Sequence, residues 1–138
     1  MKDAGFTFEV RLKNVEEKYP QELHLENVPE YLSKVKASAF REELKADEVL
    51  ITADTVVCIH DRILGKPADR KEAISMLQEL SGNRHLVVTG VSVTTRTEQL
   101  SFSSRTDVFF KHLSNEEIEF YVDTYKPFDK AGAYGIQE

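Results

Sequence analysis

Apolar residues are densest between Leu50 and Ile59, and this stretch predicts a strand in the middle of the chain. Its apolar residues are largely β-branched and do not strictly alternate with polar ones, as expected of a strand covered on both faces. One acidic residue, Asp54, interrupts the run. Burying an ionised carboxylate among apolar side chains is costly, so Asp54 either caps a turn, makes a structural hydrogen bond or takes part in acid/base chemistry.

After this strand the chain is expected to reverse direction and to bring a flexible glycine and a cation back toward Asp54. We expect a turn from His60 to Arg62, with Gly65 and Lys66 following shortly afterwards. This order predicts an anion site close to an acid/base carboxylate.

Three segments, at about residues 27–46, 69–82 and 114–127, show the periodicity of amphipathic helices. Each opens with the spacing of a capping box: Asn27 with Glu30, Asp69 with Glu72, and Ser114 with Glu117. The inward face expected of the first helix comprises Val28, Tyr31, Leu32, Val35, Ala39 and Phe40.

Further strands are expected on both sides of these helices. Residues 83–95 and 100–110 are rich in strand-forming residues, and the polar connection between them predicts a hairpin. Gly90 marks a bulge or a close backbone approach. Phe6, Phe8 and Val10 alternate as in a short strand. Helices alternating with strands predict an α/β domain in which a mixed β-sheet is flanked by helices, with ligands at one end of the sheet.

Composition limits the function classes. The chain has 138 residues, enough for one domain, and its formal net charge of −6 gives no general electrostatic case for binding nucleic acid or an anionic membrane. The single cysteine, Cys58, excludes an internal disulfide and is expected in the core. No signal peptide is recognisable, and no apolar run approaches the roughly 20 residues of a membrane span, so we expect a cytoplasmic protein.

The sequence lacks the motifs that several kinds of catalytic or binding site require. The four histidines have no zinc-like spacing with one another or with Cys58, and the chain contains neither a P-loop, nor G-x-G-x-x-G, nor G-x-S-x-G. Val56 stands where a D-x-D phosphotransfer motif would need its second acid. Acid/base chemistry by Asp54 remains, with cations holding a charged substrate. Lys36 would reach a phosphate or extend into solvent, as helical lysines usually do.

The region from Arg11 to Glu26 is polar, lacks an apolar period and predicts a solvated loop. It carries the adjacent acids Glu16 and Glu17. An acidic pair on a loop beside a site would be able to hold a cation through water.

Four ordered segments, spread over nearly all of the chain, resemble the Maf family of nucleoside triphosphate pyrophosphatases. They are Ala53-Asp54-Thr55-Val56-Val57; Ile63-Leu64-Gly65-Lys66-Pro67; Leu80-Ser81-Gly82 with His85, Val87, Thr89 and Gly90; and Asp129-Lys130-Ala131-Gly132-Ala133-Tyr134-Gly135-Ile136-Gln137. The resemblance implies the Maf/inosine-triphosphatase-like α/β architecture, often as a homodimer. It also implies cleavage of a nucleoside triphosphate between the α and β phosphates with Mg²⁺ or Mn²⁺.

The resemblance assigns catalytic roles to three residues. Asp54 matches the family's catalytic acid, Lys66 matches the lysine near the phosphates, and Glu17 resembles the glutamate of an Asp-Glu element, with Glu16 in place of the usual Asp. A divalent ion bridging Asp54, Glu17 and the phosphates would supply further positive charge.

The resemblance also implies substrate contacts. Thr55 and Gln137 match positions associated with nucleobase preference, and the ending Ala133 to Gln137 looks like the dTTP/UTP branch. Lys36 resembles the lysine of a family Lys-Ala pair and Lys130 that of an Asp-Lys-Ala-Gly run, so both are expected near the phosphates. For Lys130 a surface lysine is an equal alternative.

One family motif has no counterpart. The family opens with a strand and a Ser-x-Ser-Pro-Arg-Arg turn, which this chain does not contain. We therefore expect residues 1–138 to form a single Maf-like domain lacking the family's first strand and its last strand and helix. Two hypotheses follow: a pyrophosphatase acting on dTTP or UTP, and a catalytically silent nucleotide- or partner-binding protein linked to cell-division control.

Overall fold

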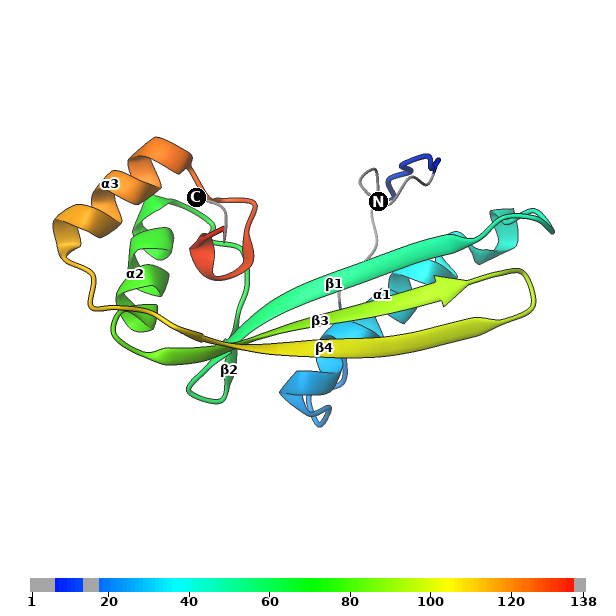
Figure 1. The fold of residues 1–138 in the computed structure, drawn as a ribbon, viewed down its shortest axis with the longest axis horizontal. Coiled ribbons are helices and arrows are strands. Elements are labelled where there is room, and N and C mark those ends of the chain that lie inside the picture. The colour runs from blue at the N-terminus through cyan, green and yellow to red at the C-terminus, as the bar shows by residue number, and fades with distance from the viewer. Residues whose placement is uncertain (1–6, 14–17, 136–138) are drawn as a thin grey trace.

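The computed structural model describes residues 7–13 and 18–135 of the chain (Figure 1). The helices and strands, in order, are η2 (Leu25–Asn27), α1 (Val28–Ser38), η3 (Arg41–Glu43), β1 (Leu50–Ile59), β2 (Arg62–Leu64), α2 (Arg70–Leu80), β3 (Arg84–Thr94), β4 (Gln99–Phe109), α3 (Asn115–Tyr125) and η4 (Ala131–Ala133). In the part of the chain that the structure describes, no helix is long and apolar enough to cross a membrane.

The strands form one sheet in the order β2-β1-β3-β4. The predicted α/β class is confirmed, but every pairing between described strands is antiparallel, so the parallel neighbours of a mixed sheet do not occur among them. The connection through α2 explains this difference. It carries the chain from β2 across β1 to β3, so two strands running in the same direction are separated by an antiparallel one.

Different helices cover the two faces of the sheet. Side chains alternate along a strand, and the Asp54 face of β1 receives α1, whose Ser33 carbonyl accepts a hydrogen bond from Thr52. Val57 lies on the opposite face, in a cluster with residues of α2 and α3. Figure 1 shows α2 and α3 gathered at one end of the long strands and α1 lying along their other half.

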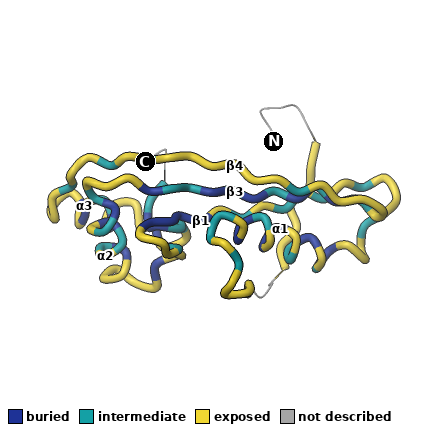
Figure 2. Tube along the Cα trace, turned by 90° about the horizontal axis from the view of Figure 1, so that it is seen from below, coloured by how far each residue is buried: buried dark blue, intermediate teal, exposed yellow. Residues whose placement is uncertain are grey.

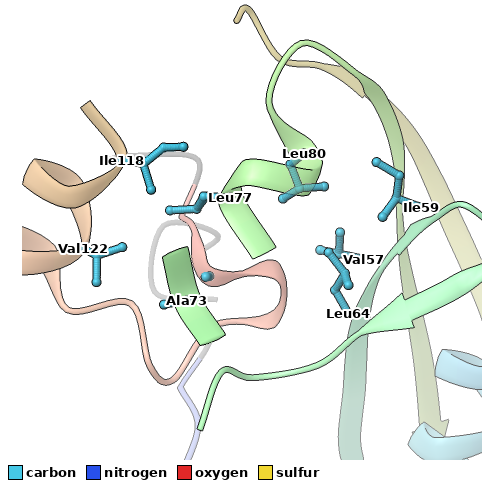
Figure 3. Packing of buried hydrophobic residues seen from close by; sticks show 9 residues of the cluster. Val57, Ile59, Leu64, Ala73, Leu77, Leu80, Ile118 and Val122 are labelled. Atoms are coloured by element: carbon cyan, nitrogen blue, oxygen red, sulfur yellow. The ribbon is translucent and has the colours of Figure 1, made fainter. Parts of the chain in front are cut away.

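The main core lies where α2, α3 and η4 meet the β1–β2 hairpin (Figure 3). Its buried members are Val57, Ile59, Leu64, Ala73, Leu77, Leu80, Ile118, Val122 and Ala133. A second cluster on the other face comprises Val56, Cys58 and Val88. Burial raises the pKa of the Cys58 thiol, in agreement with its expected place in the core.

Gly90 allows α1 to lie directly on β3. A Cβ atom at Gly90 would come within 2.2 Å of the Glu30 nitrogen and 2.3 Å of the Pro29 carbonyl carbon. The register on both sides of Gly90 is continuous, so the predicted close approach is confirmed and the alternative of a bulge is wrong.

The capping predictions are confirmed for two of the three helices. Asp69 accepts a hydrogen bond from the backbone of Glu72, and Ser114 and Glu117 form a reciprocal capping box. The prediction for Asn27 is wrong, because its side chain makes no capping bond. Asn27 ends the preceding 3-10 helix with helical dihedrals, whereas a capping residue is normally extended.

The inward face of α1 is rotated from the predicted one. Tyr31 is 37% exposed, while Ser33 and Ala37 are completely buried. The rotation has a polar cause: the hydroxyls of Ser33 and Ser92 lie 2.6 Å apart, so a serine faces the sheet where an apolar residue was expected.

Three strand predictions also change. The two-face burial predicted for β1 holds only for its last four residues, because the other six alternate between intermediate and exposed. Strand β2 was not predicted; a two-residue turn with positive φ at His60 and Asp61 forms the hairpin. The described residues 7–13, which include Phe8 and Val10, form no strand because no described strand pairs with them, and Phe6 lies outside the described residues.

Candidate functional site

The outer edge of β1 is open next to Asp54. Strand β2 pairs only with Val57, Cys58 and Ile59. From Leu50 to Val56, therefore, β1 has a strand neighbour on one side only within the described sheet. A strand edge of this kind leaves backbone groups accessible to another molecule.

Asp54 and Lys36 form an ion pair at this edge. The Lys36 ammonium donates to Asp54 Oδ1 at 3.0 Å and to the Ala53 carbonyl at 3.1 Å. The Asp54 side chain is 13% exposed and that of Lys36 is 27% exposed. The pair is thus largely removed from water, where a charge interaction is stronger than on an open surface. The structure brings together the predicted acid and one predicted phosphate-binding lysine.

Buried hydroxyls fix the place of Lys36. The Thr52 hydroxyl donates to the Ser33 carbonyl at 2.7 Å, and the Ser33 hydroxyl lies 2.6 Å from that of Ser92. Lys36 lies three residues further along α1, one turn from this anchor. Sequence reasoning missed these hydroxyls, although Ser33 within an otherwise apolar helix face was a signal that could have found them.

Lys66 and Lys130 lie on two segments that contact each other. The Gly132 N–H donates to the Gly65 carbonyl at 3.1 Å, which joins the loop after β2 to η4. The hydrogen bond from Lys130, with a smaller contribution from the charge of Lys66, holds the pKa of the Asp129 carboxyl below its ordinary value. Two predicted phosphate-binding lysines therefore act on one exposed carboxylate, which sequence reasoning did not single out.

Thr55 lies on the opposite face of β1 from Asp54. Its hydroxyl is 2.9 Å from that of Thr89 on the neighbouring strand. This is also the face on which η4 packs, because a Cβ atom at Gly132 would lie 3.0 Å from Val57 Cγ2. The structure therefore places Thr55 on the face of β1 where η4 packs against Val57, and Asp54 on the face that carries Lys36.

Two predicted site residues, Glu17 and Gln137, lie outside the described residues. Within the described ranges, no cluster of three or more His, Cys, Asp or Glu side chains has the arrangement of a metal site. A single carboxylate such as Asp54 nevertheless fits the way in which Mg²⁺ is commonly held, by one or two carboxylates together with substrate phosphates.

Comparison with known proteins identifies the family. Residues 1–138 match the sequence profile of a family described as Maf-like protein. The chain belongs to this family.

Individual relatives support the same family assignment. A Bacteroides thetaiotaomicron protein named dTTP/UTP pyrophosphatase is 50% identical over 139 residues, covering 100% of this chain and 72% of the relative. A Phocaeicola vulgatus protein of the same name is 48% identical, covering 97% of the chain and 70% of the relative. A Flavobacterium johnsoniae protein, also named dTTP/UTP pyrophosphatase, is 46% identical, covering 99% of this chain and 71% of the relative. The resemblance inferred from the four sequence segments is confirmed.

Proposed function

We propose that this chain hydrolyses dTTP or UTP to the nucleoside monophosphate and pyrophosphate. The observation that carries the proposal is the largely buried contact between Asp54 and Lys36 at an open strand edge. In addition, relatives named dTTP/UTP pyrophosphatase are identical to this chain at about half of the aligned residues.

The chemistry needs a nucleophilic water and neutralisation of the phosphate charge. Asp54 would accept a proton from the attacking water as it approaches the α-phosphate. Lys36, already within 3.0 Å of Asp54, would hold a phosphate oxygen beside it. Lys66 and Lys130 would neutralise the remaining phosphates, which become more negative as pyrophosphate departs.

A divalent cation, Mg²⁺ or Mn²⁺, completes the proposed site. Asp54 would hold it together with the substrate phosphates, and Glu17 is the further acidic ligand proposed. When bound, the ion supplies positive charge at the phosphoanhydride. The roles of Asp54 and Glu17 as metal ligands are proposed from the resemblance to the Maf family.

Thr55 and Gln137 are proposed to select the nucleobase. The amide of Gln137 donates one hydrogen bond and accepts another, as the carbonyl and N–H edge of uracil or thymine requires. Thr55 lies on the face of β1 where η4 packs against Val57.

The test is pyrophosphate release from dTTP, UTP, CTP and 7-methyl-GTP with Mg²⁺ or Mn²⁺. Asp54→Asn keeps an oxygen that accepts from Lys36 but removes the base, so we expect turnover to be lost while the fold remains. Asp47→Asn is the matched control, because Asp47 is an exposed residue of the turn before β1. Undiminished turnover by Asp54→Asn would remove Asp54 from the mechanism.

The same experiment tests the catalytically silent alternative. If dTTP raises the melting temperature of the wild-type chain but no pyrophosphate is released, the chain binds nucleotides without hydrolysing them. If no nucleotide has either effect, both hydrolysis and nucleotide binding fail, and only the partner-binding form of the alternative remains.

We also propose a homodimer in the cytoplasm. Between Thr55 and the start of β1 at Leu50, the sheet exposes an apolar row on the face opposite α1. In this row Ile51, Leu100 and Phe102 are 49%, 66% and 48% exposed. Figure 2 shows that β4 is exposed along most of its length. Light scattering after size exclusion should give a dimer for the wild type and a monomer for Phe102→Glu, with Thr97→Glu in the hairpin turn as the control.

A further inference from the structure

A strained backbone conformation occurs in η4. Ala133 has φ 63° and follows Gly132 at φ 71°, and Ala133 is completely buried. A left-handed conformation is unfavourable for a residue with a Cβ atom. Such residues persist when the surrounding structure holds them, and they are frequent at functional sites.

The chain before Ala133 is held against β1. The Gly132 N–H donates to the Gly65 carbonyl at 3.1 Å, and its Cα lies so close to Val57 that a Cβ atom would be 3.0 Å from Cγ2. These contacts fix η4 against the loop that carries Lys66.

The chain after Ala133 is held by two side chains from other elements. The Tyr134 hydroxyl lies 2.6 Å from His85 Nε2 of β3, and the Gly135 N–H donates to the Tyr121 hydroxyl of α3 at 3.0 Å. Phe110 packs edge-on against both rings of the His85–Tyr134 pair, with centroids 4.9 Å apart in each case. Ala133 is therefore flanked by hydrogen bonds on both sides.

Burying the polar ring of His85 in the core costs free energy. It is 2% exposed, and its Nδ1 has no hydrogen-bond partner within the described residues. Burial lowers the pKa of His85 and raises that of Tyr134 to about 12, so both are neutral near pH 7. Because a buried polar atom without a partner costs free energy, packing alone would favour an apolar ring at this place. The contact with Tyr134 is what His85 adds.

We propose that His85, Tyr134 and Tyr121 are positioning residues, which hold η4 in its strained conformation and thereby fix the backbone of residues 130–135, which leads to the proposed phosphate and base contacts. This inference rests on the proposed function, in which Lys130 contacts phosphate and Gln137, which lies outside the described residues, contacts the base. The three side chains touch no substrate in this scheme. They act by setting where the backbone on each side of Ala133 runs.

The experiment compares Tyr134→Phe and Tyr121→Phe in the 138-residue chain, since each variant removes one hydroxyl and keeps the ring. Tyr125→Phe is the control, because the Tyr125 ring lies tilted against that of Tyr121, with centroids 5.1 Å apart, while its hydroxyl makes no hydrogen bond within the described residues. Two quantities are measured: kcat/KM for UTP and CTP, and hydrogen–deuterium exchange of the peptide covering residues 128–135.

The ratio of kcat/KM for UTP to that for CTP separates positioning from folding. A variant that is partly unfolded loses activity on both nucleotides equally, so the ratio stays constant. We expect Tyr134→Phe and Tyr121→Phe to lower this ratio by about 10-fold and to speed exchange in residues 128–135, with Tyr125→Phe unchanged.

Each outcome decides a different statement. An unchanged ratio together with unchanged exchange would overturn the positioning role. A wild-type chain that releases no pyrophosphate from any nucleotide would overturn the proposed function. Exchange in residues 128–135 would then still decide whether the hydroxyls of Tyr134 and Tyr121 hold η4.

Discussion

Replacing Gly90 by alanine should displace α1 from the sheet. The added Cβ atom would lie 2.2, 2.3 and 2.5 Å from three backbone atoms of Pro29 and Glu30, at the start of the helix. Backbone atoms cannot rotate away as the end of a side chain can. Since an ordinary contact needs about 3.4 Å, the first turn of α1 must move by about 1 Å.

The expected cost follows from overpacking. Extra methylene groups in a packed interior cost about 1–3 kcal/mol, and the backbone contacts at Gly90 place this change at the upper end. For a chain of this size, about 3 kcal/mol lowers the melting temperature by about 10 °C. Lys36 moves with α1. If Lys36 holds a phosphate as proposed, a misplacement of about 1 Å should lower turnover of dTTP by about 100-fold.

Thermal unfolding of Gly90→Ala beside Gly65→Ala tests this reasoning. A Cβ atom at Gly65 would meet nothing within 4 Å, so that variant should melt within about 2 °C of the wild type. If Gly90→Ala melts at the wild-type temperature, α1 does not lie against β3 as described, and the placement of Lys36 beside Asp54 loses its support.

Three further changes test other parts of the structure. Burial lowers the pKa of His85, so below about pH 6.5 the unfolded chain binds more protons and stability falls; the urea midpoint should drop between about pH 7.5 and 5.5 by more in the wild type than in His85→Phe. Burial raises the pKa of the Cys58 thiol, so a disulfide reagent should label it at least about 100-fold faster in urea than in the folded chain, and equal rates would contradict its burial. Ser114→Ala removes the capping hydroxyl that accepts from Glu117 and should cost about 1 kcal/mol in urea unfolding, against a negligible effect of Ser75→Ala on the exposed side of α2.

The sequence predicted those elements whose signals are local. Helix α3 is delimited by the capping residue Ser114 and by Pro127, both within a few residues of its ends. The hairpin of β3 and β4 follows from two runs of strand-forming residues around a polar turn. Each of these signals acts over a few residues, so no knowledge of the tertiary structure was needed.

What the sequence did not predict depends on contacts between distant residues. The rotation of α1 that buries Ser33 and exposes Tyr31 requires Ser92, which is 59 residues away. Asp54 and Lys36 were both proposed as site residues, but only the packing of α1 on β1 makes them an ion pair. The three-residue strand β2 is too short for a periodicity signal.

The shortness of β2 itself bears on the site. Alternation along β1 places Asp54 and Thr55 on opposite faces, so a substrate that contacts both must pass around the edge of the strand. That edge is accessible because β2 ends at Leu64, just before Gly65, Lys66 and Pro67. Pro67 has no N–H, so it cannot donate to a resumed ladder with β1. The end of β2 at Leu64 therefore keeps the edge of β1 open next to Asp54 and Thr55, the residues that we propose as the catalytic acid and as a base-selecting contact.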